Sequence, residues 1–301
     1  MKFISRIFPF VLLALFIITC NQKRDGEKET ILEGNMTLLV DESLLPIVEE
    51  QVEVFESQYN AKITLEPKSE AEVIQILAND SARVAVLARN LTKDELNVFK
   101  SKKISPRITK FATDGIALIA NKNLQDTIVS LEQVLDVLRQ KPVSGIKGLV
   151  FDNPNSSTAQ YMNQLAGIKS FPATGVFSFK TNEETIKYVS ENEGMIGVVG
   201  VNWVYNPREA IRPFVEKIHI LSVADPSGNT SFPSQNDIAE GKYPLARDLF
   251  IVNCQGFSGL GMGFASFIAG ETGQRIVLKS GLVPAKTPGR KILIRQDIEK
   301  K

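Results

Sequence analysis

The sequence predicts an α/β fold, because short apolar runs alternate along the chain with segments of helical periodicity. From Asn35 onward, the run M-T-L-L-V has the character of a buried strand. One helical face follows it, made of Leu44, Val48, Val52, Phe55 and Tyr59. This alternation argues against a helical bundle and an all-β sandwich, and the long, helix-bearing connections favour sheets that are largely parallel.

Later elements are predicted from the same two signals. Further strands are expected at 61–67, 84–88, 111–120, 148–151, 195–199 and 217–223. A Ser or Thr followed three residues later by Glu or Gln can exchange two backbone hydrogen bonds at the start of a helix. Such pairs are Ser69 and Glu72, Thr92 and Glu95, Ser130 and Gln133, and Thr181 and Glu184. The stretch 225–244 has the Pro- and Gly-rich composition of a loop, and the last helix, 271–280, is ended by Gly281.

Residues 1–19 have the pattern of a secretory signal peptide. Lys2 and Arg6 precede an apolar run that stops at Cys20 and is shorter than the roughly 20 residues of a membrane-spanning helix. A cysteine at this place resembles the lipobox of bacterial lipoproteins, so Cys20 is predicted to carry a lipid on the periplasmic side of a bacterial membrane. Thr19 differs from the usual Gly or Ala, and an ordinary signal peptide or an uncleaved anchor are the alternatives.

Composition limits what the exported part can be. Residues 20–34 are charged and almost without apolar side chains, which predicts a solvated tether. Cleavage after residue 19 of 301 would leave 282 residues, enough for two lobes with separate cores. The net charge of +1 offers no field to hold nucleic acid. A lipid on Cys20 leaves Cys254 unable to form an intrachain disulfide, and His219 is the only histidine, which argues against a histidine-based zinc site.

Six strings, in this order, resemble the phosphate-binding subunit of ABC transporters, a type II periplasmic solute-binding protein. They are A-R-N-L-T at 88–92, D-G-I-A-L-I-A-N at 114–121, N-S-S-T at 155–158, G-M-I-G-V at 194–198, Y-P-L-A-R at 243–247 and G-Q-R-I-V-L-K-S-G-L-V-P-A at 273–285. The resemblance implies two lobes, each with a mixed, mostly parallel sheet, joined by a two-stranded hinge. Lobe 1 would comprise 35–115 and 245–301, and lobe 2 would comprise 116–244.

The resemblance also implies ligand loops at four places, of which the first two are in lobe 1. Asp41, Glu42 and Ser43 follow the first strand, where backbone N–H groups suit an anion. The two carboxylates would oppose a phosphate there, and the alternative is that Asp41 or Ser43 only caps the helix. Arg89 ends a buried strand, where its fork of donors fits two oxyanion oxygens; a structural ion pair is the alternative.

The other two places lie at the hinge and in lobe 2. Asp114 would accept the proton of a bound hydrogen phosphate, unless it only stabilises an Asp-Gly turn. Ser156, Ser157 and Thr158 offer hydroxyls and N–H groups at a helix start, with simple capping as the alternative. Asp152 stands where the family usually has an arginine.

Three functions are compatible with these observations. The first is a monomeric lipoprotein that binds phosphate or a similar oxyanion, needs no cofactor, and delivers it to an ABC permease. The second keeps the fold but acts as an envelope sensor or interaction module, which the added carboxylates favour. The third, a serine hydrolase using Ser156 or Ser157, lacks a G-x-S-x-G elbow and an adjacent base, so a non-enzyme is predicted.

Overall fold

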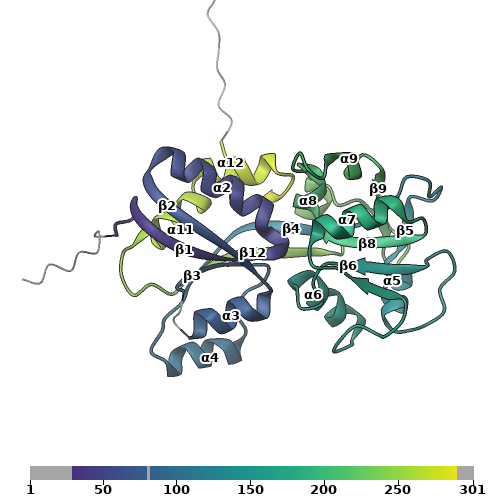
Figure 1. Ribbon diagram of the computed structural model, residues 1–301, viewed down its shortest axis with the longest axis horizontal. Coiled ribbons are helices and arrows are strands. Elements are labelled where there is room, and N and C mark those ends of the chain that lie inside the picture. Colours follow the sequence, from purple (N-terminus) through teal and green to yellow (C-terminus); the bar gives the residue numbers. More distant parts are fainter. Residues whose placement is uncertain (1–28, 80–81, 290–301) are drawn as a thin grey trace, which may run out of the picture.

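The computed structural model describes residues 29–79 and 82–289, which form two α/β lobes side by side (Figure 1). The predicted fold class is therefore confirmed. The predicted signal peptide 1–19, the lipid site Cys20 and most of the tether lie outside the described residues. No helix within the described ranges is long and apolar enough to cross a membrane.

Lobe 1 is a sheet with helices on both faces. Its strands run in the order β2-β1-β3-β12-β4, and β1 is parallel to both of its neighbours, β2 and β3. Figure 1 shows α2, α11 and α12 on one side of this sheet and α3 and α4 on the other. The elements are β1 (Glu33–Asp41), η1 (Glu42–Leu44), α2 (Leu45–Gln58), β2 (Asn60–Lys68), α3 (Glu70–Ala78), β3 (Val84–Leu87), α4 (Lys93–Ser101), α11 (Leu260–Ala269), α12 (Glu271–Lys279) and β13 (Val283–Pro284).

Two long strands, β4 (Arg107–Asn121) and β12 (Ala246–Asn253), join the lobes. The first part of β4, residues 107–115, pairs with β12, and the part from Ile116 onward pairs with β8 of lobe 2. The backbone N–H of Ile116 donates to the carbonyl of Leu245, so the outgoing and returning chains are bonded where they cross. The functional residues described below lie at this crossing.

Lobe 2 is built mainly on β8, β6 and β7, which are parallel neighbours, with β4 antiparallel to β8. The predicted strand 217–223 is divided into β9 and β10, which belong to different sheets. The elements are β5 (Ile128–Ser130), α5 (Leu131–Leu138), β6 (Gly148–Phe151), α6 (Ser157–Ala166), β7 (Val176–Ser178), α7 (Asn182–Glu191), β8 (Met195–Gly200), α8 (Val201–Tyr205), α9 (Arg212–Val215), β9 (Ile218–Ile220), β10 (Ser222–Ala224), β11 (Thr230–Ser231) and α10 (Gln235–Ala239).

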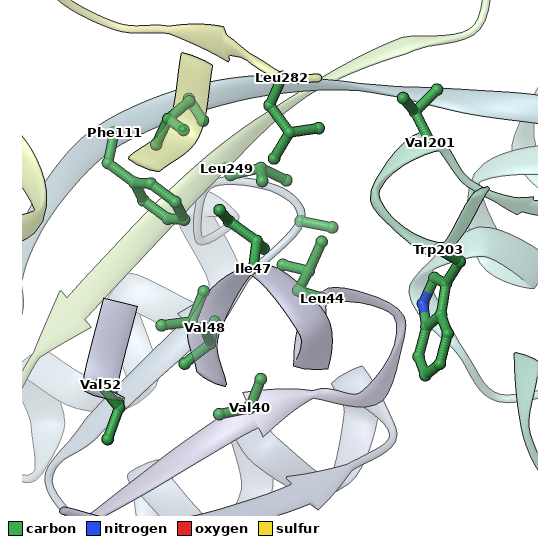
Figure 2. Close-up of a cluster of buried hydrophobic side chains, with 14 of the residues drawn as sticks. Val40, Leu44, Ile47, Val48, Val52, Phe111, Val201, Trp203, Leu249 and Leu282 are labelled. Atoms are coloured by element: carbon green, nitrogen blue, oxygen red, sulfur yellow. The ribbon is translucent and has the colours of Figure 1, made fainter. Parts of the chain in front are cut away.

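One apolar core continues from lobe 1 into lobe 2. Figure 2 shows Val40, Leu44 and Ile47 near the hinge residue Leu249, with Trp203 of α8 on the lobe 2 side. All five are buried. Because burying one such side chain is worth about 1.5–3 kcal/mol, this core holds η1 and α8 against each other beside the crossing strands.

The predicted tether does not extend to residue 34. The side chain of Glu29 accepts hydrogen bonds from Gln255 Nε2 at 2.8 Å and from the backbone N–H of Leu260 at 2.6 Å. Strand β1 then begins at Glu33. The charged composition placed the end of the tether too late in the chain, because Glu29 already bonds the N-terminus of α11. That contact joins residues far apart in the sequence.

Candidate functional site

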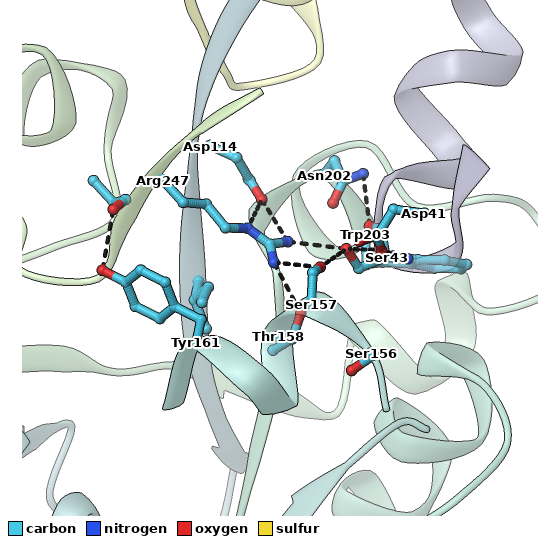
Figure 3. A network of polar contacts seen from close by, with 12 residues as sticks. Asp41, Ser43, Asp114, Ser156, Ser157, Thr158, Tyr161, Asn202, Trp203 and Arg247 are labelled. Atoms are coloured by element: carbon cyan, nitrogen blue, oxygen red, sulfur yellow. Dashed lines mark hydrogen bonds and ion pairs between the residues drawn. The ribbon is translucent and has the colours of Figure 1, made fainter. Parts of the chain in front are cut away.

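A buried arginine, Arg247 on β12, lies where the two lobes meet (Figure 3). Its Nη1 donates to Ser157 Oγ at 2.9 Å and to Thr158 Oγ1 at 3.2 Å, both in lobe 2. Its Nη2 donates to Ser43 Oγ of lobe 1 at 3.1 Å. One guanidinium thus addresses hydroxyl groups from both lobes.

Asp114 on β4 holds Arg247 in this position. Its Oδ2 accepts from Nε at 3.1 Å and from Nη2 at 3.0 Å, and both side chains are buried. Burial raises the pKa of Asp114 above its ordinary value, and the guanidinium of Arg247 opposes this shift. The sequence placed Asp114 at an Asp-Gly turn or at a ligand; the structure places it inside a continuous strand, paired with Arg247.

Ser43 comes from the short 3-10 helix η1 and has several bonded neighbours besides Arg247. Its hydroxyl donates to Asp41 Oδ1 at 2.7 Å and lies 3.0 Å from Ser157 Oγ across the lobes. Its carbonyl accepts from Trp203 Nε1 at 2.8 Å. Asp41 also accepts from the N–H of Ser43 at 2.9 Å, which is the capping role considered for it from the sequence.

The predicted triplet at the start of α6 is divided between two environments. Ser157 and Thr158 face Arg247. Ser156 is the N-cap of α6, accepts from the N–H of Ala159 at 3.2 Å, and donates to Asp152 Oδ1 at 2.5 Å. Because its hydroxyl is directed at Asp152, Ser156 does not join the group around Arg247.

Three acidic residues, Asp41, Glu42 and Asp152, lie close enough to one another near Ser43 and Ser156 to affect each other's charge. Burial raises the pKa of Asp152 to about 7, and the negative charge of Asp41 adds to the shift. Burial also raises the pKa of Glu42 to about 7, with the charges of Asp152 and Asp41 as further causes. Asp152, which stands in place of the family arginine, is buried and also accepts from Asn182 Nδ2 at 2.8 Å.

Arg89 is not the cation of this site. Its Nε donates to Glu70 Oε1 at 2.7 Å, and its two Nη atoms donate to the carboxylate of Glu95 at 2.9 and 2.8 Å. These two acids satisfy the fork of donors, so the structure corresponds to the ion-pair alternative. Glu70 is itself buried, and this burial raises its pKa to about 7.

A hollow of about 1090 Å³ opens beside the buried arginine. Arg89, Ser157 and Arg247 line it, whereas the predicted residues Asp41, Glu42, Ser43, Asp114, Ser156 and Thr158 are not part of its lining. Its remaining walls come from α3, from α6 and the segment that follows it, and from the hinge strands. Within the described ranges, no cluster of three His, Cys, Asp or Glu side chains is arranged to hold a metal ion.

Arg247 is the functional residue that the sequence interpretation did not assign. It ends the string Y-P-L-A-R, which carried part of the resemblance, and it takes the first buried position of β12, two residues before the apolar Leu249. A charged residue at such a position is rarely buried without a partner. That rule would have singled it out beside Asp114.

Two α/β lobes that the chain crosses twice, meeting around one buried cation and three hydroxyls, define the class of two-lobed binding proteins. A family model described as the PBP superfamily domain matches residues 26–272, and the chain belongs to this superfamily.

Sequence relatives agree with the resemblance stated above, which is confirmed. The phosphate-binding protein PstS of Borreliella burgdorferi is 25% identical over 302 residues, covering 93% of this chain and 98% of that protein. The phosphate-binding protein PstS of Pseudomonas aeruginosa is 21% identical, covering 86% of this chain and 85% of that protein.

Solved structures have the same fold. A phosphate ABC transporter substrate-binding protein of Clostridium perfringens, solved with bound phosphate and described as putative, has a TM-score of 0.70 at 20% identity. The alignment covers 84% of this chain and 100% of that chain. An ABC-type phosphate transport receptor of Vibrio cholerae has a TM-score of 0.64 at 16% identity. The alignment covers 83% of this chain and 100% of that chain.

Proposed function

We propose that this protein is an extracytoplasmic solute-binding lipoprotein that binds phosphate or a similar small oxyanion for ABC-type uptake. It would be monomeric, non-enzymatic and held at the periplasmic side of a bacterial membrane by a lipid on Cys20. The observation that carries the proposal is the buried guanidinium of Arg247, which addresses Ser43, Ser157 and Thr158 from both lobes.

The arrangement can hold an anion by charge and by hydroxyl rotation. Hydroxyl groups both donate and accept, so Ser157, which now accepts from Arg247 and lines the hollow, can turn to donate to an oxyanion held there. Arg247 is planar and offers paired donors that match two oxyanion oxygens. Because Asp114 already balances its charge, a protonated oxyanion that also donates a hydrogen bond suits the site better than a fully charged one.

The relatives support the same ligand. The two curated relatives described above are named as phosphate-binding proteins, and each aligns with more than four fifths of this chain. The structural neighbour from Clostridium perfringens contains phosphate. The fold shared with that neighbour supports a small anion as the ligand of this chain.

Calorimetric titration of the purified mature protein with phosphate and with sulfate tests the proposal. Phosphate is expected to bind, and Ser157→Ala is expected to weaken it roughly tenfold or more, since a hydrogen bond to a charged group is worth about 1.5–3 kcal/mol. Ser178→Ala, at an exposed position of β7, is the matched control. Absence of binding by both anions would remove the proposal.

The second hypothesis, an envelope sensor or interaction module, is favoured by one observation. Asp41, Glu42 and Asp152 put three carboxyl groups beside the hydroxyls that would receive the anion. If neither phosphate nor sulfate binds while the protein remains folded, this second hypothesis becomes the better one.

A further inference from the structure

We propose that the ligand is an organic phosphate, namely a phosphorylated sugar or polyol. Its phosphate would bind at Ser157 and Arg247, and its hydroxylated body would fill the hollow beside them. This inference rests on the proposed function, because it uses the same anion-binding group. It adds the chemical class of the part of the ligand that is not the anion.

The first argument is size. The hollow measures about 1090 Å³, just above the roughly 300–1,000 Å³ typical of sites for drug-sized ligands. A phosphate ion has five heavy atoms, and even at the roughly 30 Å³ that one water occupies in the liquid, it fills only about 150 Å³. Phosphate alone would leave most of the hollow to water.

The second argument is that closure has already occurred at the hydroxyl end. Ser43 of lobe 1 and Ser157 of lobe 2 are 3.0 Å apart, and Trp203 of lobe 2 donates to the carbonyl of Ser43. These contacts leave no gap between the lobes at that end. The hollow lies to one side of these contacts, between α6 of lobe 2 and both β12 and the segment after β3 of lobe 1, so it opens beside lobes that already touch.

The third argument is the chemistry of the walls. Gln160 and Gln164, one helical turn apart on α6, line the hollow, and so does Asn90 of lobe 1. Gln160 Nε2 donates to the carbonyl of Asn155 and Asn90 Oδ1 accepts from the N–H of Leu91, which leaves the other half of each amide for a ligand. Amides both donate and accept, which is what sugar hydroxyls require. Phe171 and Phe250 give the same space apolar surface for the C–H faces of such a body.

The charges of the walls favour a ligand whose body is neutral. Arg89 is matched by Glu70 and Glu95, and Asp248 is matched by Lys110 at 2.6 Å. Lys169, an exposed residue of the segment after α6, adds a cation to the lining and favours a ligand of net negative charge. A single phosphate on an uncharged, hydroxylated body meets both conditions.

Calorimetry of the mature protein tests this class directly. The ligands are inorganic phosphate, glucose, and a panel of glucose 6-phosphate, ribose 5-phosphate and glycerol 3-phosphate. At least one phosphorylated member is expected to bind roughly tenfold or more tightly than inorganic phosphate, which corresponds to about 1.4 kcal/mol. Glucose, without the anion, is expected to give no measurable heat of binding.

A pair of variants on α6 locates the body of the ligand. Gln164 is exposed and lines the hollow, whereas Leu165 is exposed and does not. Gln164→Trp is expected to remove the tenfold advantage of the organic phosphate while inorganic phosphate binds as before. Leu165→Trp, the same substitution one residue along the helix, is expected to change neither.

Each outcome decides between the two proposals. If inorganic phosphate binds as tightly as every member of the panel, or if Gln164→Trp leaves the advantage intact, the organic ligand is excluded and the oxyanion site stands. If no phosphate-bearing compound binds to the folded protein, the proposed function fails and the present inference fails with it.

Discussion

Arg247 and Asp114 show how much depends on single residues here. Both side chains are buried and each is the other's charge partner, while the sequence-based choice, Arg89, is occupied by Glu70 and Glu95. Which arginine faces the hydroxyls is decided by the pairing of β4 with β12, residues more than a hundred positions apart. No local pattern around Arg89 contains that information.

Removal of the arginine is expected to destabilise the fold as well as the site. Arg247→Met leaves Asp114 as an uncompensated buried carboxylate, which typically costs about 3–5 kcal/mol. Urea denaturation measures the loss. Lys62→Met, which breaks the exposed pair with Glu56, should cost about 0–1 kcal/mol, and an equal effect of the two variants would contradict the account.

Asp152 is expected to make stability fall as the pH rises. Its pKa is raised to about 7 in the folded protein, above the ordinary value of 3.8, so between these values the folded protein retains a proton that the unfolded chain releases. The favourable contribution is complete below pH 4 and is lost as the pH passes 7. Glu42, whose pKa is also raised to about 7, acts in the same direction.

Asp152→Asn should flatten this dependence. The amide oxygen can still accept from Ser156, and Asn182, whose Oδ1 has no partner among the described residues, can turn its amide to accept from the new NH₂. Thermal melting between pH 5 and 8 is the measurement. The melting temperature of the variant should rise relative to that of the unaltered protein as the pH approaches 8. If the melting temperatures of both proteins change in the same way with pH, Asp152 does not hold the proton.

Helix starts were the most local feature, and the sequence predicted them well. Capping boxes are present at Ser69, Thr92 and Ser130 as predicted. At Thr181 the hydroxyl accepts from the N–H of Glu184, but the carboxylate of Glu184 bonds the N–H of Lys180 instead of Thr181. Such contacts span three or four residues, so the sequence contains nearly all that decides them.

The cap of α7 gives a prediction at this scale. Thr181→Ala removes the acceptor for the N–H of Glu184, and loss of an N-cap costs about 0.5–2 kcal/mol. Chemical denaturation should show that loss. The exposed position Ser178, mutated to Ala, should remain within about 0.5 kcal/mol of the unaltered protein, as surface substitutions usually do.

For the whole molecule, an ion-paired arginine beside Trp203 adds to the contacts between the lobes. Arg208, in lobe 2, bonds both Glu49 of α2 in lobe 1 and Glu183 of α7. Arg208 also lies over the ring of Trp203, with 5.3 Å between its Cζ and the ring centroid. Trp203 is the only tryptophan in the chain, so its fluorescence reports this junction directly.

Charge reversal at Glu49 is expected to loosen the junction. Glu49→Lys places a second cation beside Arg208, which should expose Trp203 to water, shift its emission to the red and lower oxyanion affinity several-fold. Fluorescence spectra with and without added phosphate measure both effects. Glu53→Lys, on an exposed position of the same helix, controls for net charge, and an identical red shift there would refute the role of this contact.

Taken alone, the sequence determined the α/β class, most strands and most helix starts, because apolar periodicity and capping act over a few residues. The tertiary structure alone decided that Arg247 is the central cation, that Arg89 and Ser156 are directed to carboxylates, and that residues from Glu29 onward belong to lobe 1. Each of these depends on side chains brought together by strand pairing between distant segments. A single sequence does not specify such pairing residue by residue.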